Sequence, residues 1–319
     1  MAQRIFVFVE TELQETHHAD IPSLLESDAV FWIDIHQPSM ADFQLLESTF
    51  RFHPLAVEDT RNGRQRPKAE DYGEMLFVIL NAIRKTDTDI FFDEIDVFMG
   101  KNYVVTVHDD ALPLLDQVVS RCNRFMHPQI RVSSGYLLYV ISDVIVDGYF
   151  PILEAIGDEL DTVIENVLKD PRQATLERVF ILRRILSEMW RVASQKREIF
   201  TTLARKEVTL LDDKILRYYL RDVHDHLIRV TDQINTFRDT VSNIVDLYLS
   251  SVSNRLNNFV QRLTIATVGI GVIAAIGGFY GMNFEHTFPA FHEPWGVWFA
   301  LGLMALTILG IIFYIRRVK

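Results

Sequence analysis

The sequence predicts an α+β membrane protein: an N-terminal α/β layered domain, then long helices, then two membrane-spanning helices. Two uncharged runs of 22 residues, Leu263–Phe284 and Pro294–Ile315, lie near the C-terminus. A helix needs about 20 apolar residues to cross the hydrocarbon core of a bilayer, so both runs are long enough. Upstream, residues 158–268 contain no glycine and a single proline, Pro171, as long helices do.

The charges beside the two runs predict their orientation. The connection between them carries two acids, Glu285 and Glu293, and no Lys or Arg, whereas Arg262 precedes the first run and the tail 316–319 is basic. Lys and Arg favour the cytoplasmic side of a membrane. We therefore expect a multi-pass protein of the cytoplasmic (inner) membrane with both termini in the cytoplasm and the acidic loop outside.

The domain before the helices mixes short β-rich runs with helical ones, which suggests a layered α/β arrangement. Its expected strands are rich in Val, Ile and aromatic residues: Ile5–Val9, Ala29–Ile35, Met75–Ile83, Ile95–Phe98 and Tyr103–Val107. Helices are expected after Ser39, a suitable N-cap, and at Leu112–Arg124.

The long helices divide near Asp170-Pro171, where Asp170 would cap a helix with proline in its first turn, and again near 208–212. From there one helix continues uninterrupted into the first span, about 70 residues or about 105 Å at 1.5 Å per residue. Heptad-like contacts among copies would bury its apolar stripe. The predicted organisation is a cytoplasmic α/β domain at 1–145, a helical hairpin at 146–211, a stalk helix at 212–262, spans at 263–283 and 295–315, an external loop at 284–294 and a basic tail at 316–319.

The composition and the absence of certain motifs argue against several classes of function. The net charge of −11 argues against nucleic acid as a partner, and the single cysteine, Cys122, suits a reducing cytoplasm. The sequence contains no nucleotide-binding loop, HExxH motif or nucleophile–base pattern, so we expect no enzyme.

We expect the basic run and the histidines outside the predicted spans to have no binding function. The basic run Arg64–Lys68 lacks the glycine-rich loop of a phosphate site, and we expect it to pair with nearby acids. His17, His18, His224 and His226 lack companion Cys or His residues at metal-site spacing, so we expect them to be surface residues.

At the end of the first run stands Tyr-Gly-Met-Asn-Phe-Glu, residues 280–285. Here the chain resembles the CorA family of magnesium and divalent-cation transporters, whose signature is Gly-Met-Asn at the outer end of the first of two C-terminal spans. The resemblance extends to 53–59, 65–68, 221–226 and 250–254 and covers most of the chain. It implies a funnel-shaped homopentamer in the lipid bilayer that transports Mg²⁺, with Co²⁺ and Ni²⁺ as further candidates. It implies no other protein partner.

The Gly-Met-Asn residues Gly281, Met282 and Asn283 are the expected selectivity filter. A ring of Asn283 side-chain carbonyls and Gly281 backbone carbonyls would hold hydrated Mg²⁺ without trapping it, because Mg²⁺ sheds its water reluctantly. Glycine and asparagine also simply end helices; the resemblance favours the filter. The outer loop lacks a glutamate that the family often carries, so Glu285, with Glu293 as a substitute, would supply the outer negative field.

Helical phase predicts which face of the first span lines the pore. The positions on that face are Asn257, Val260 or Gln261, Thr264, Val268, Gly271, Ala274 or Ala275 and Gly278. The resemblance implies that Asn257, Val260, Leu263, Gly271 and Ala274 line the pore. An apolar ring at Val260 and Leu263 could then close it by excluding water.

The stalk also carries a predicted regulatory metal site. Asp246 lies 11 residues before Asn257, about three turns, and so shares its face. The family holds a regulatory divalent ion between a carboxylate at this position and an acid of the neighbouring α/β domain. Here we expect the partner to be Asp89, with Asp87 and Asp93 as alternatives. Asp246 as an ordinary solvated residue is the competing interpretation.

Two other functions compete with magnesium transport. A zinc-transporting relative of the same fold is the nearer one, but no Cys or clustered His lies near the pore. A membrane-anchored scaffold is the more distant one, and it would need neither the amide at the helix end nor the long uninterrupted helix.

Overall fold

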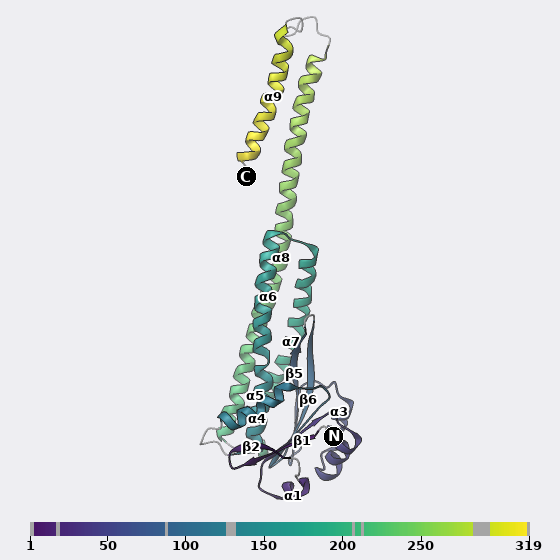
Figure 1. Ribbon diagram of the computed structural model, residues 1–319, viewed down its shortest axis with the longest axis vertical. Coiled ribbons are helices and arrows are strands. Elements are labelled where there is room, and N and C mark those ends of the chain that lie inside the picture. The colour runs from purple at the N-terminus through teal and green to yellow at the C-terminus, as the bar shows by residue number, and fades with distance from the viewer. Residues whose placement is uncertain are drawn as a thin grey trace. The chain divides into compact units, whose positions relative to one another are not determined.

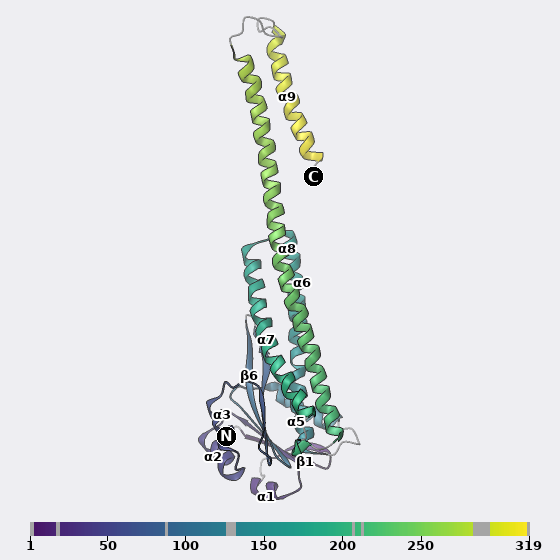
Figure 2. The same ribbon diagram turned by 180° about the vertical axis from the view of Figure 1, so that it is seen from behind.

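The computed structural model describes residues 3–16, 20–86, 89–125, 132–205, 208–211, 214–282 and 294–317 (Figures 1 and 2). The chain forms two compact units, Met1–Val245 and Asp246–Lys319. The first unit combines one sheet with helices, and the second is a pair of helices.

The sheet of the first unit has seven strands in the order β2-β1-β3-β7-β6-β5-β4. Neighbouring strands are antiparallel except β3 and β7, which run parallel with Ile33 opposite Val105. The strands are β1 (Gln3–Val9), β2 (Glu12–Thr16), β3 (Phe31–His36), β4 (Lys68–Asp71), β5 (Leu76–Lys85), β6 (Ile90–Met99) and β7 (Tyr103–His108). All five predicted strands are confirmed. The two that were missed, β2 and β4, are the short, polar edge strands.

One face of the sheet is covered by α1 (Ile21–Glu26), α2 (Met40–Gln44), the π-helical turn η1 (Leu45–Thr49) and α3 (Pro54–Asn62). Ser39 begins α2 as predicted, in a capping box in which its backbone N–H donates to Asp42 Oδ2 at 2.7 Å. The core beneath is aromatic: the Phe52 and Phe98 rings stack with centroids 4.4 Å apart.

Further helices complete the first unit: η2 (Pro113–Leu115), α4 (Asp116–Phe125), α5 (Ser134–Asp147), α6 (Tyr149–Lys169), α7 (Gln173–Arg205) and η3 (Thr209–Leu211). Helix α5 contacts β5, β6 and β7 and is buried along almost its whole length. The predicted breaks near 170 and 208–212 are confirmed. The predicted cap was wrong, because Asp170 ends α6 and α7 begins only at Gln173.

A single helix, α8 (Lys214–Tyr280, 67 residues), follows, which confirms the uninterrupted helix expected from the absence of breakers. In the first unit its buried positions repeat mostly at intervals of three and four: Leu216, Leu220, Val223, Leu227, Val230, Ile234, Val241 and Ile244. This stripe is covered by the chain's own helices; an added Cβ on Gly135 of α5, for example, would lie 2.3 Å from Leu216 Cδ2. The expectation that copies bury this stripe was therefore wrong for residues 216–244.

Three helical segments of the described chain are long and apolar enough to cross a membrane. The first, Ser134–Lys169, owes its apolar character to the core of the first unit, because 67% of its most apolar window is buried. The other two lie in α8 and α9, and only 6% of each window is buried. These two correspond to the predicted spans.

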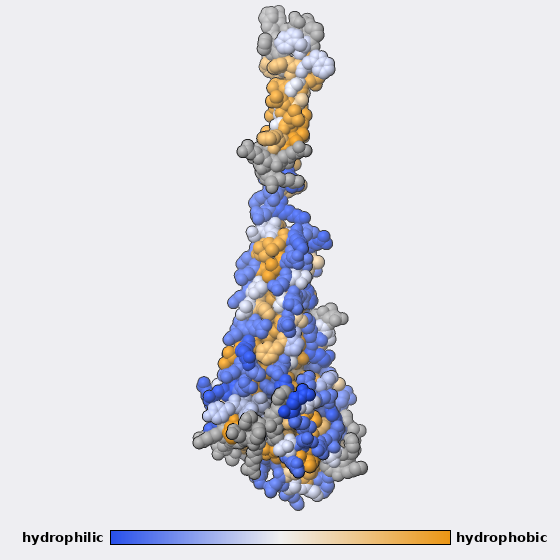
Figure 3. All heavy atoms as spheres, turned by 60° about the vertical axis from the view of Figure 1, so that its left-hand side comes forward, coloured by the Kyte–Doolittle hydropathy of each residue, from blue (hydrophilic) through white to orange (hydrophobic). Residues whose placement is uncertain are grey.

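The second unit is a hairpin of the C-terminal part of α8 and α9 (Pro294–Arg317), which run antiparallel (Figure 1). Hydrophobic side chains cover the face of this hairpin seen in Figure 3. The helices approach closely at Gly269, where an added Cβ would lie 2.6 Å from Ile311 Cδ1. Between residues 252 and 279 of α8, the positions that are not exposed are Ile265, Gly269, Ile273 and Ile276, which fall on one face.

Replacing Gly269 tests this packing. Gly269→Leu should destabilise the hairpin by about 1–3 kcal/mol, because the added side chain meets Ile311. The matched control is Gly302→Leu on α9, where an added Cβ has no neighbour within 4 Å, and there we expect no destabilisation, because leucine is the better helix former. Thermal unfolding in mild detergent measures both. Equal melting temperatures for the two variants would contradict the packing.

Candidate functional site

The candidate site is the face of α8 that points away from α9. At about 100° per residue, the positions Asn257, Val260, Thr264, Gly271 and Ala274 centre about 160° from the less exposed face around Gly269. All five are exposed, as is Leu263 at the edge of this face. Within the second unit, the predicted pore-lining residues therefore lie together on a free face.

This face is almost without charge or free polar groups. The Thr264 hydroxyl donates to the Val260 carbonyl at 2.8 Å, so its proton is held by the helix backbone. Val260 and Leu263 are 50% and 57% exposed, and an added Cβ on Gly271 would have no neighbour within 4 Å. Such a surface can pack against copies of itself, or it can border water without binding ions tightly.

The outer end of the face coincides with the end of α8. The helix ends at Tyr280, and the next residues form a turn in which Gly281 N–H donates to the Gly277 carbonyl at 2.9 Å. A Cβ on Gly281 would lie 3.1 Å from that oxygen, so glycine suits this close approach. Met282 is exposed. Asn283, Glu285 and Glu293 lie outside the described residues, and their predicted roles stay predictions.

Acids continue along α8 before the second unit begins. Asp225, Asp232 and Asp239 are exposed and seven residues apart, and Asp246 follows after another seven. Two helical turns separate such positions, so they lie on nearly one side of the helix. Sequence reasoning singled out Asp246 alone, although the seven-residue spacing of the others is visible in the sequence.

The candidate partners of Asp246 differ in accessibility. Asp93 is buried, and both of its carboxylate oxygens accept from Arg84, at 2.7 and 2.9 Å. Asp89 is 47% exposed and pairs with Arg184 Nη2 at 2.7 Å. Asp87 lies outside the described residues. Of the two described candidates, Asp89 is the one that an external ligand can reach.

For Lys68, at the end of the basic run Arg64–Lys68, the expected pairing with acids is confirmed. Lys68 Nζ lies 2.6 Å from Asp59 Oδ2 and 2.9 Å from Glu70 Oε1, and the backbone N–H of Gln65 donates to Glu94. The run borders a cleft of about 800 Å³ in the first unit. Burial and the nearby Glu94 raise the pKa of Asp96, in the cleft wall, to about 8.

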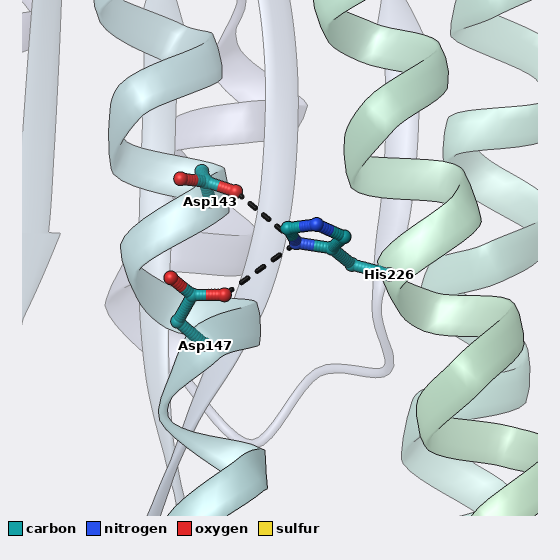
Figure 4. Close-up of side chains that lie close together, drawn as sticks. All are labelled: Asp143, Asp147 and His226. Carbon is teal, nitrogen blue, oxygen red and sulfur yellow. Dashed lines mark ion pairs between the residues drawn. The ribbon is translucent and has the colours of Figure 1, made fainter. Parts of the chain in front are cut away.

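One expectation about histidines was wrong. His226 is not a surface residue: its side chain is 19% exposed and faces Asp143 and Asp147 of α5 (Figure 4). His226 has no companion Cys or His nearby in the sequence, and the residues that it faces are carboxylates about 80 positions earlier. His224 is 23% exposed and lies beside Asp225, and His17 and His18 lie outside the described residues.

Comparison with known proteins gives one consistent result. Residues 27–317 match the family described as CorA-like Mg²⁺ transporter protein. The cobalt/magnesium transport protein CorA of Thermotoga maritima is 34% identical over 315 residues, which cover 97% of this chain and 89% of that protein. The complete CorA structure from Methanocaldococcus jannaschii matches all of this chain and 98% of its own with a TM-score of 0.77 at 20% identity. The ZntB cytoplasmic domain from Vibrio parahaemolyticus matches 79% of this chain and 98% of its own, with a TM-score of 0.63 at 12% identity. These two structures are evidence of the fold alone.

Proposed function

Because the chain belongs to the CorA family of Mg²⁺ transporters, we propose that several copies of it form a pore through which Mg²⁺ crosses the cytoplasmic membrane. The family consists of ion transporters, which agrees with the expectation that the chain is no enzyme. Several copies are necessary because one helical hairpin cannot enclose a water-filled path.

The observation that carries this proposal is the opposition of two faces on α8. One face packs against α9, and the other, from Asn257 to Ala274, is exposed and nearly uncharged. In a symmetric ring the exposed faces surround the axis and the α9 helices lie outside, in contact with lipid. We infer five copies from the family resemblance. From the basic residues at Arg262 and 316–319 we infer that both termini lie in the cytoplasm.

Selection takes place where α8 ends. The Gly281 backbone carbonyls and Asn283 amide oxygens of the copies form a collar of neutral acceptors that holds Mg²⁺ with its water shell. Glu285 and Glu293 attract cations to the outer entrance. The same collar can admit Co²⁺ and Ni²⁺, and cobalt appears in the name of the Thermotoga maritima relative.

Cytoplasmic Mg²⁺ regulates the pore through Asp246 and Asp89 of a neighbouring copy. Two carboxylates 4 to 5 Å apart repel by about 4 kcal/mol at an effective dielectric constant near 20. A bridging Mg²⁺ turns this repulsion into attraction and favours the closed state, and the ion replaces Arg184 as the partner of Asp89. When internal Mg²⁺ falls, the sites empty and the pore opens.

The number of copies can be measured directly. Native mass spectrometry of the protein in mild detergent with lipid should give the mass of a pentamer, because the exposed α8 faces need partners. A stable monomer or dimer under these conditions would contradict the ring.

The filter can be tested by uptake into liposomes loaded with a magnesium-sensitive dye. Asn283→Ala removes the acceptor collar, and Asn283→Asp creates a ring of carboxylates that binds cations too tightly to release. Both should reduce Mg²⁺ uptake at least tenfold. The control is Asn258→Ala, a neighbour of Asn257 that helical phase places away from the proposed pore. Wild-type uptake by either Asn283 variant would remove the filter from the proposal, and preferential Zn²⁺ uptake by the wild type would favour a zinc transporter.

The sensor can be tested by recording current against internal Mg²⁺. Asp246→Lys should shift half-inhibition to at least tenfold higher Mg²⁺ while permeation persists, because the bridging ligand is lost. Asp161→Lys makes the same charge change at an exposed position on α6 and should leave inhibition unchanged. If both variants keep wild-type inhibition, the sensor lies elsewhere.

A further inference from the structure

We propose that Asp143, Asp147 and His226 form a binding site for a divalent transition-metal ion, such as Zn²⁺ or Co²⁺, apart from the transport path. The two aspartates are four residues apart on α5, so their carboxylates lie on one face of that helix. His226 reaches toward them from α8 (Figure 4). All three residues belong to the first unit.

The spacing of the donor atoms fits an ion better than it fits direct hydrogen bonds. His226 Nδ1 lies 3.4 Å from Asp143 Oδ1 and 3.5 Å from Asp147 Oδ1. Ligands about 2.0–2.2 Å from a tetrahedral metal stand about 3.3–3.6 Å from one another. A direct N–H···O hydrogen bond measures about 2.7–3.2 Å. The three ligand atoms all lie within 4.8 Å of one another, so small side-chain movements are enough to close them around an ion.

Two of the three facing atoms have no hydrogen-bond partner in the described part of the chain. Asp143 Oδ1 and His226 Nδ1 are both buried, and neither has a hydrogen-bond partner among the described residues. The Asp143 side chain is only 10% exposed, and burial together with the charge of Asp147 raises its pKa to about 6. A cation at this point would compensate two carboxylates that the protein otherwise holds close together.

Neighbouring charges hold the three ligands in position. Arg121 of α4 donates to Oδ2 of both Asp143 and Asp147, which leaves both Oδ1 atoms turned toward His226. On the other side of the imidazole ring, Asp222 Oδ1 lies 3.8 Å from Nε2. When a metal occupies Nδ1, the proton of the ring is on Nε2, where this carboxylate stabilises it.

The donor set decides which ion is bound. One imidazole nitrogen with two carboxylate oxygens suits Zn²⁺, Co²⁺ or Ni²⁺, and a water molecule can complete the coordination. Mg²⁺ prefers oxygen ligands in octahedral geometry and keeps much of its water, so it should compete poorly. Since α5 packs against the sheet, a bound ion would tie α8 to the sheet layer and stabilise the first unit.

The test uses the purified full-length protein in detergent, stripped of metal and kept in excess Mg²⁺ to fill oxygen-ligand sites. Titration with Co²⁺ should produce the visible absorption bands of low-coordinate cobalt, and equimolar Zn²⁺ should abolish them. Zn²⁺ should also raise the melting temperature. In His226→Ala both responses should be lost. In His224→Ala, a matched control two residues away, both should persist.

Equal cobalt spectra and equal Zn²⁺ stabilisation in His226→Ala and wild type would overturn the proposal, as would the absence of cobalt bands in wild type. Metal-free circular dichroism and melting curves establish whether the alanine variant folds. His226→Gln, which keeps a side chain of similar size but no imidazole, should behave like His226→Ala. None of these measurements depends on transport, so they are independent of the filter and sensor experiments.

Discussion

The periodicity of α8 is the constraint on which the rest of the structure depends. Because α8 is one uninterrupted helix, successive segments of it pack against different partners. Each side chain can face only one of these partners. Residues 216–244 bury an apolar stripe against the chain's own helices, and residues 265–276 turn toward α9. The remaining faces carry exposed aspartates before Asp246 and small or apolar residues after Asn257. Helix geometry thus separates the packing positions from the exposed positions that we propose face ions.

The secondary structure could be predicted from the sequence wherever one local property of the residues determines it. Runs of Val, Ile and Phe predicted the buried strands correctly. The absence of glycine over residues 158–268 predicted the long helices. The edge strands β2 and β4 were not predicted, because they are polar and lack the alternation of apolar and polar residues that marks a half-buried strand. Asp170 was assigned to the wrong helix end, since local capping preferences could not say whether α6 or α7 would use it.

Sites formed across elements were harder to anticipate. Helical phase predicted which positions share a face of α8, because they belong to one continuous helix, and the family resemblance assigned that face to the pore. The grouping of His226 with Asp143 and Asp147 depends on how α5 packs against α8, and no spacing in the sequence encodes that packing. Asp93 shows the same limit: only the fold reveals that Arg84 already occupies both of its oxygens. The function of Asn283 rests on the family signature.

The two proposed kinds of ion site differ in the way that their tasks require. An ion that must pass through has to be released as readily as it is bound, so neutral oxygen dipoles and an intact water shell suit the filter. An ion that holds two helices together should leave slowly, and a partly buried imidazole with two carboxylates binds it through direct bonds. Uncharged collar residues beside a bilayer and a charged cluster inside a folded unit are therefore not interchangeable. Hydrated Mg²⁺ suits the first environment, and a nitrogen-preferring transition-metal ion suits the second. On these grounds one chain can carry magnesium and still respond separately to a second class of metal.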